Sequence, residues 1–165
     1  MSFHSRLKSA IADHQKAVAV VAQQRVTGRR IVFTNGVFDV FHTGHADYLA
    51  QARDLGDFLV VGINSDESVK RLNKGLERPY NELLSRATIL AALACVDLVV
   101  AFTEDTPAGL IRLLKPDILV KGNDYQVEQI AGHDFVMSYG GRVITIPLLE
   151  GFSTTSLVKK IKHSG

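Results

Sequence analysis

Two histidines, His42 and His45, stand three residues apart where a predicted helix begins. At that spacing both imidazole rings can lie on one side of the helix. Gly44 between them lets a bulky ligand approach the backbone, and the free N–H groups and dipole of a helix N-terminus favour a phosphate. Two imidazoles beside a phosphate indicate charge stabilisation during phosphoryl or nucleotidyl transfer.

Other interpretations of the histidine pair stay open at this point. Two histidines near a helix end can be surface residues without a function. A zinc site would need a third ligand, but no further Cys or His has ligand spacing and Cys95 is isolated. The absence of a GxxxxGK loop and of a GxGxxG fingerprint removes the main support for kinase and dinucleotide-binding functions.

The elements that must position these residues alternate between strands and helices. Apolar runs predict strands over Arg30–Thr34, Phe58–Ile63, Leu98–Phe102, Ile118–Lys121 and Arg142–Ile146. Helical patterns cover Ser5–Gln24, Thr43–Leu55, Glu82–Leu93, Pro107–Leu114 and Thr154–Lys162, with a polar loop over Leu72–Asn81. The alternation predicts an α/β fold, a Rossmann-like doubly wound parallel sheet of about five strands with helices on both faces. Ligands bind beyond the carboxyl ends of the strands in such sheets.

Length and composition narrow the function classes. The 165 residues fit one domain, which we divide into an N-terminal helical extension (1–28) and a core (29–163). The 19 Lys+Arg nearly balance the 17 Asp+Glu, which argues against a strongly basic nucleic-acid binder. No signal peptide begins the chain and no apolar stretch is long enough to span a bilayer. With a single cysteine, these features predict a soluble, cytoplasmic protein without a membrane partner.

Several short motifs follow one another around the histidine pair. Gly36-Val37-Phe38-Asp39 precedes His42-Thr43-Gly44-His45, and the later motifs are Gly62-Ile63-Asn64-Ser65-Asp66, Arg78-Pro79, Arg86, Lys121-Gly122-Asn123-Asp124-Tyr125 and Glu150-Gly151-Phe152-Ser153-Thr154-Thr155. This series resembles the nucleotidyltransferase superfamily with the HxGH signature. It is most similar to the branch that adenylylates heptose 1-phosphate. The resemblance covers the chain from Gly28 to Lys162.

The resemblance implies an enzyme that transfers AMP from ATP to D-glycero-β-D-manno-heptose 1-phosphate. The products would be pyrophosphate and ADP-heptose for the inner core of lipopolysaccharide. Many bacteria fuse this activity to a sugar kinase, and a chain of this length is expected to be the stand-alone form. Mg²⁺ is expected because it accompanies a triphosphate, with no residue assigned as its ligand. A homo-oligomer is also left open.

Two alternatives remain at this point. Cytidylyltransferases for glycerol 3-phosphate in the same superfamily carry an arginine before the final Gly-Xaa-Ser-Thr-Thr segment and another before a Val-Asp pair. The corresponding positions here hold Glu150 and Ala94, which argues against that function. The other alternative is a non-catalytic nucleotide-binding module on the same fold.

The resemblance also assigns roles to individual residues. His42 and His45 are expected to contact the α- and β-phosphates, and Lys74, with Lys70 as second choice, to assist catalysis. The expected nucleotide-binding residues are Asn35, Gly36, Val37, Phe38, Asp39, Gly44, Asn64, Arg78, Arg86, Lys121, Gly122, Asp124, Ser153, Thr154 and Thr155.

Several of these residues have a structural alternative. Asp39 is expected to orient His42 or the turn rather than to bind a metal. Phe38 fits the core equally well, and Arg86 can be a salt-bridging helix residue. Ser153 to Thr155 can act as a helix N-cap, which uses the same N–H groups as phosphate binding.

Overall fold

The computed structural model describes residues 2–72 and 77–163, and all statements on the fold refer to these residues. Its centre is a parallel sheet in the order β1-β4-β3-β2-β5-β6. The strands are β1 (Ile11–Ala12), β2 (Ile31–Gly36), β3 (Phe58–Asn64), β4 (Leu98–Phe102), β5 (Ile118–Gly122) and β6 (Arg142–Ile146). The helices are α1 (Phe3–Ser9), α2 (His14–Val26), α3 (Thr43–Asp54), α4 (Asp66–Arg71), α5 (Leu83–Ala91), α6 (Ala108–Leu114), the short η1 (Val127–Gln129), α7 (His133–Ser138) and α8 (Thr154–His163).

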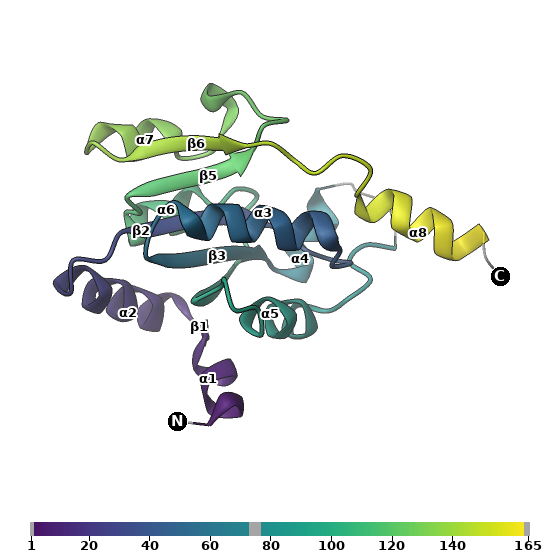
Figure 1. Cartoon of the computed structure of the whole chain (residues 1–165), viewed down its shortest axis with the longest axis horizontal. Helices are drawn as coiled ribbons and strands as arrows, with labels where there is room; N and C mark the ends of the chain where they lie inside the picture. The colour runs from purple at the N-terminus through teal and green to yellow at the C-terminus, as the bar shows by residue number, and fades with distance from the viewer. Residues whose placement is uncertain (1, 73–76, 164–165) are drawn as a thin grey trace.

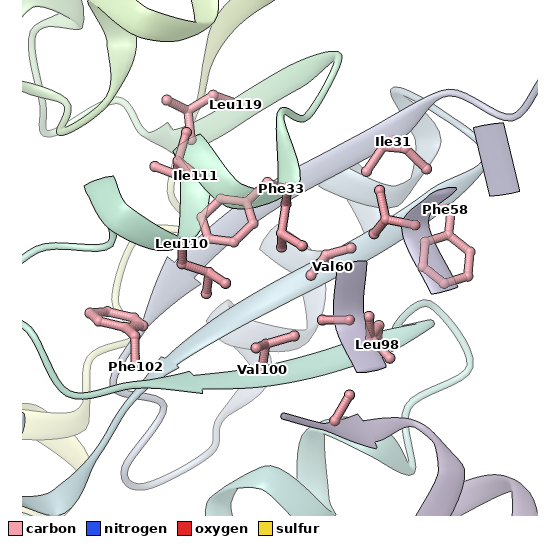
Figure 2. Packing of buried hydrophobic residues seen from close by; sticks show 14 of the residues in the cluster. Ile31, Phe33, Phe58, Val60, Leu98, Val100, Phe102, Leu110, Ile111 and Leu119 are labelled. Atoms are coloured by element: carbon pink, nitrogen blue, oxygen red, sulfur yellow. The ribbon is translucent and has the colours of Figure 1, made fainter. Parts of the chain in front are cut away.

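Helices cover both faces of the sheet, so the predicted doubly wound α/β fold is confirmed (Figure 1). Side chains of successive strand residues point to opposite faces. On one face Phe33 and Val100 pack with Leu110 of α6, in a cluster that also includes residues of α2 and α7 (Figure 2). On the other face Val61 shares a cluster with Leu49 of α3 and residues of α5. Burial on both faces explains why the strands read as continuous apolar runs.

The N-terminal segment differs from its prediction. The expected helix over Ser5–Gln24 is wrong, because it is interrupted by β1, which pairs with β4. A new helix starts where the Asp13 carboxylate accepts the N–H of Lys16 at 2.7 Å, an N-cap that stabilises the start of α2. Val21 of α2 is buried in the core. Residues 11–26 are thus built into the sheet and its core rather than appended to them.

The short helices α4, η1 and α7 were not predicted from the sequence. The Ser65 hydroxyl accepts the N–H of Ser68 and starts α4 directly after β3, while α7 lies between β5 and β6. With β1 included, the described residues form six strands where about five were expected. No helix in ranges 2–72 and 77–163 has the length and apolar character needed to cross a membrane.

The order of the strands fixes where a ligand can bind. From β2 the chain adds β3 and β4 on one side, and then β5 and β6 on the other side of β2. The direction of winding therefore reverses between β2 and β5. In open α/β sheets a crevice forms at the carboxyl ends of the strands at this reversal, which places the candidate site there.

Candidate functional site

A cavity of about 400 Å³ lies at the reversal, beyond the ends of β2 and β5. The predicted site residues that line it are Asn35, Gly36, Val37, Phe38, Asp39, His42, Gly44, His45, Arg78, Lys121, Gly122, Asp124, Ser153, Thr154 and Thr155. They come from the two strand ends, the starts of α3 and α8, and the segment before α5. The fold thus brings together residues that are more than a hundred positions apart along the chain.

The histidine pair lies at the start of α3. His42 occupies the N-cap position with an extended backbone, and no side chain caps the helix there. The rings of His42 and His45 stack with centroids 3.8 Å apart and an interplanar angle of 20°. The Nδ1 atoms of both rings are buried and have no hydrogen-bond partner. Buried polar atoms normally have a partner, so these two nitrogens are an exception among the described residues, and both histidines line the cavity.

Both histidines are held in the neutral form. Burial, and secondly the charge of His42, lower the pKa of His45 to about 4. Burial also lowers the pKa of His42. The aromatic rings of Phe38 and Phe41 lie against His45, with centroids 5.2 Å and 5.5 Å away. At neutral pH each imidazole therefore presents one N–H donor and one acceptor rather than a fixed positive charge.

Two glycines leave room for this arrangement. A Cβ on Gly44 would lie 3.1 Å from the His42 ring and 3.1 Å from the Cβ of Phe152. A Cβ on Gly36 would lie 2.9 Å from the Phe38 ring. Phe38 itself has a φ of 50°, in the left-handed region that is costly for residues with a Cβ. The β2–α3 turn is therefore shaped to bring the aromatic ring onto the histidine pair.

A lysine at the end of β5 reaches across to β2. The Nζ of Lys121 donates to the backbone carbonyl and side-chain oxygen of Asn35, at 3.0 and 3.1 Å. The same ammonium lies 5.3 Å from the centre of the Tyr125 ring, a cation–π distance. Lys121 thus places a positive charge at the point where the winding reverses.

The start of α8 forms another wall of the cavity. The Ser153 hydroxyl accepts the N–H of Ser156 at 3.0 Å, so Ser153 acts as an N-cap. Thr154 donates to the carbonyl of Val40 at 3.4 Å and ties α8 to the turn before α3. Two helix N-termini therefore border one cavity, and their dipoles together favour an anion.

Asp39 holds the segment before α5 rather than His42. Its buried carboxylate accepts the backbone N–H groups of Tyr80 and Asn81, both at 2.9 Å. It also accepts from Arg78 at 3.2 Å, and the Arg78 guanidinium lies over the Tyr80 ring. The sequence predicts that Asp39 orients His42 or the turn; these bonds serve the turn, which they tie to Arg78 and to the segment before α5.

Arg86 and Asn64 are predicted site residues that do not line this cavity. Arg86 is fully buried behind it and pairs with Asp66 at 2.6 Å, which is the salt-bridge alternative rather than a ligand contact. Asn64 donates to the Ser68 hydroxyl and borders a neighbouring cavity. Lys74 lies outside the described residues.

The cavity also has walls that sequence reasoning missed. They are Tyr48, Val69, Tyr125, Leu148, Leu149 and Phe152. Tyr48 follows His45 by three positions on α3, a spacing that could have indicated it. Its hydroxyl bonds Thr34 at 2.7 Å, and burial raises the pKa of Tyr48. Leu148 and Leu149 belong to no motif, and Phe152 lies in the last motif without an assigned role, so the tertiary structure is needed to place them at the cavity.

A second cavity, of about 240 Å³, adjoins the first. Both share Asn35, Gly36, Val37, Lys121 and Tyr125 as lining residues. The second cavity adds polar side chains from several segments, among them Asn64, Asp105, Thr106 and Gln129. In the part of the chain that the structure describes, no group of three or more His, Cys, Asp or Glu residues gathers to hold a metal ion.

Comparisons with known proteins show which family the chain resembles. The family model "Cytidylyltransferase-like" matches residues 33–160. The bifunctional protein HldE of Halorhodospira halophila is 55% identical over 157 residues, which are 95% of this chain and 33% of that protein. The chain therefore spans a third of the length of that relative. The D-beta-D-heptose 1-phosphate adenylyltransferase of Bordetella bronchiseptica is 50% identical over 159 residues, which are 96% of this chain and 98% of that protein.

Solved structures show the same fold. The lipopolysaccharide core biosynthesis protein from Thermoplasma volcanium is 28% identical with a TM-score of 0.62, covering 74% of this chain and 100% of that chain. Pantoate-beta-alanine ligase from Francisella tularensis, at 18% identity and a TM-score of 0.62, shares the fold alone. The chain belongs to the cytidylyltransferase-like family.

Proposed function

We propose that this chain transfers AMP from ATP to D-glycero-β-D-manno-heptose 1-phosphate and releases pyrophosphate. The observation that carries the proposal is the 50% identity with a heptose 1-phosphate adenylyltransferase across 96% of this chain and 98% of that protein. The product, ADP-heptose, is an activated sugar for the inner core of lipopolysaccharide. The proposal places the reaction in the cytoplasm, where ATP is supplied.

The cavity suits a reaction that needs little acid–base chemistry. An oxygen of the sugar phosphate attacks the α-phosphorus of ATP. The bond from that phosphorus to the bridging oxygen of the β-phosphate breaks, and pyrophosphate leaves with the electron pair. The nucleophile is already an anion, so catalysis rests on positioning and on stabilising negative charge. The N-termini of α3 and α8 and the cations of Lys121 and Arg78 supply that stabilisation.

His42 and His45 act as uncharged donors to the phosphates in this proposal. Their low pKa values keep the imidazoles neutral before ATP enters. A phosphate nearby favours the protonated ring, so binding raises both pKa values and strengthens the hydrogen bonds. Ser153, Thr154 and Thr155 border the same cavity, and the N-terminus of α8 would hold the β- and γ-phosphates.

The acceptor would occupy the second cavity. It shares the Asn35 and Lys121 wall with the first cavity, so a sugar phosphate there lies next to the α-phosphate. Its amide, carboxylate and hydroxyl side chains suit the hydroxyl groups of a sugar. Because the described residues form no metal-ligand cluster, we propose that Mg²⁺ enters with ATP as part of the substrate.

Pyrophosphate release with matched substrate pairs tests the function. The purified chain is given ATP or CTP, each with heptose 1-phosphate or glycerol 3-phosphate. ATP with heptose 1-phosphate should give the highest kcat/KM. A preference for CTP with glycerol 3-phosphate would contradict the proposal, and ATP binding without turnover of any pair would indicate a non-catalytic module.

A further inference from the structure

Arg86 of α5 is a fully buried arginine that stands directly behind the β2–α3 turn. Its Nε donates to the carbonyl of Asn81 at 2.9 Å and its Nη1 to the carbonyl of Val37 at 2.8 Å. Its Nη2 donates to the carboxylate of Asp66 at 2.6 Å. The planar guanidinium therefore fixes the β2–α3 turn, the segment before α5 and the start of α4 relative to one another. The flexible ammonium of a lysine does not have this fixed fork of donors.

A fully buried arginine needs an explanation beyond stability. Arg86 is removed from water, whereas the Asp66 side chain is 32% exposed. Burying the guanidinium is costly, and well-packed apolar side chains often stabilise a core equally well. Here the second carboxylate oxygen of Asp66 also accepts the N–H of Leu83 at the start of α5. The pair thus specifies one arrangement of α4, α5 and the turn after β2, rather than only filling space.

The turn that Arg86 holds leads directly to the histidine pair. Val37 precedes Phe38, whose backbone is in the left-handed region. On the other side of Phe38, the carbonyl of Asp39 accepts from the side chain of Asn81 at 2.6 Å. Phe38 is therefore held between two anchored neighbours, and its ring lies edge-on to His45.

We propose that Arg86 is a positioning residue for the reaction. By fixing the Val37 carbonyl against Asn81 and Asp66, it keeps Phe38 in its left-handed conformation and its ring against His45. The imidazole of His45 is thereby held in one place before the nucleotide arrives. The effect on turnover rests on the proposed adenylyl transfer, whereas the effect on His45 itself does not.

Arg86→Lys tests the proposal because it retains the buried charge but loses the three-way fork. The matched control is Arg53→Lys at the far end of α3, where Arg53 pairs with Asp97 at 2.9 Å and donates to the carbonyl of Gly56. Four quantities are measured in each variant: the urea midpoint of unfolding, the pKa of His45 by NMR of its ring protons, the kcat, and the KM for ATP.

The expected result separates positioning from stability. In folded Arg86→Lys, the pKa of His45 should rise from about 4 towards 6.5, because the Phe38 ring no longer covers the imidazole. The charged neighbour that also sets this pKa, His42, is unchanged in the variant. The kcat should fall about tenfold or more with a smaller change in KM, as expected when a reacting group is misplaced. Arg53→Lys should change neither the pKa of His45 nor the kcat.

Two outcomes overturn the proposal. One is a folded Arg86→Lys variant with the parent pKa of His45 and the parent kcat. If Arg86→Lys does not fold, Phe38→Leu tests the same route without touching the buried charge, and an unchanged pKa of His45 in that variant also overturns it. The pKa of His45 can rise in Arg86→Lys while the unsubstituted chain shows no adenylyl transfer. That result would contradict the proposed function and still support the positioning role of Arg86.

Discussion

At the scale of single residues, the cavity is lined by two permanent cations, Lys121 and Arg78, and by two neutral imidazoles, His42 and His45. The permanent cations Lys121 and Arg78 are each tied to an oxygen of the β2–α3 region, on Asn35 and Asp39. Desolvation lowers the pKa of both histidines and keeps them neutral, and the rings of Phe38 and Phe41 lie against His45. The net charge of +2 therefore says little about the charge that a ligand meets locally.

Removing one imidazole should affect turnover more than binding. We expect His45→Ala to lower kcat by about 10²–10³-fold, as for other donors that act on developing charge, with a smaller change in the KM for ATP. His45→Gln should recover part of the loss because its amide still donates. The measurement is pyrophosphate release at saturating ATP and sugar phosphate. His133→Ala is the control, since His133 begins α7 and bonds the carbonyl of Ile130, and a normal kcat in His45→Ala would refute the role.

His45 should also make the protein less stable in mild acid. Its pKa is about 4 in the folded chain against an ordinary value of 6.5, so below pH 6.5 the unfolded chain binds a proton that the folded chain does not. Folding stability is therefore lost as the pH falls from 6.5 towards 4, by up to about 2 kcal/mol at pH 5. Urea unfolding at pH 7 and pH 5 should show a smaller pH effect in His45→Gln than in the parent. Equal pH effects in both proteins would show that burial of His45 has no such cost.

At the scale of elements, the ends of two strands and the starts of two helices meet at the site. Apolar runs made β2 to β5 predictable, and β6 was predicted although it is polar at its start and half-buried. Asn35, Lys121 and Gly122, chosen at strand ends by the rule for ligand binding, line the cavity. The two-residue β1 was not predictable, because an Ala-Ile-Ala stretch fits a helix until its pairing with β4 is known. The bond from Arg86 to Val37 spans 49 positions and has no local signal.

A pair of glycine variants separates helix propensity from the needs of the site. Ala is generally favoured over Gly in helices by about 1 kcal/mol. In α6 a Cβ on Gly109 would meet only Glu104, at 3.8 Å, so Gly109→Ala should stabilise the chain by about 0.5–1 kcal/mol. In α3 a Cβ on Gly44 would press on His42 and Phe152 at 3.1 Å. Gly44→Ala should therefore lower kcat without a matching gain in the urea midpoint, and parallel behaviour of the two variants would contradict this account.

At the scale of the whole molecule, the N-terminal segment completes the sheet. The backbone N–H of Val99 in β4 donates to the carbonyl of Ala10 at 2.7 Å, next to the β1–β4 pairing. The side chains of Ala17 and Val21 lie in the same cluster as Phe33 and Leu110, so α2 seals one face of the core. In contrast, α1 has no buried residues and Phe3 is 88% exposed. The expected boundary after residue 28 therefore cuts through the core, whereas a boundary after Ser9 does not.

Two truncations test whether the domain begins before β1. Removing residues 1–9 should change the melting temperature by only a few degrees, because α1 buries nothing. Removing residues 1–28 exposes the edge of β4 and uncovers the cluster around Leu110, and burial of Val21 alone contributes about 2 kcal/mol. At roughly 2–4 °C per kcal/mol for a chain of this size, the longer truncation should lose about 10 °C or more, or unfold without a cooperative transition. Calorimetry of both forms beside the full chain gives the answer. A 29–165 fragment that melts like the full chain would show that residues 11–26 are an appendage after all.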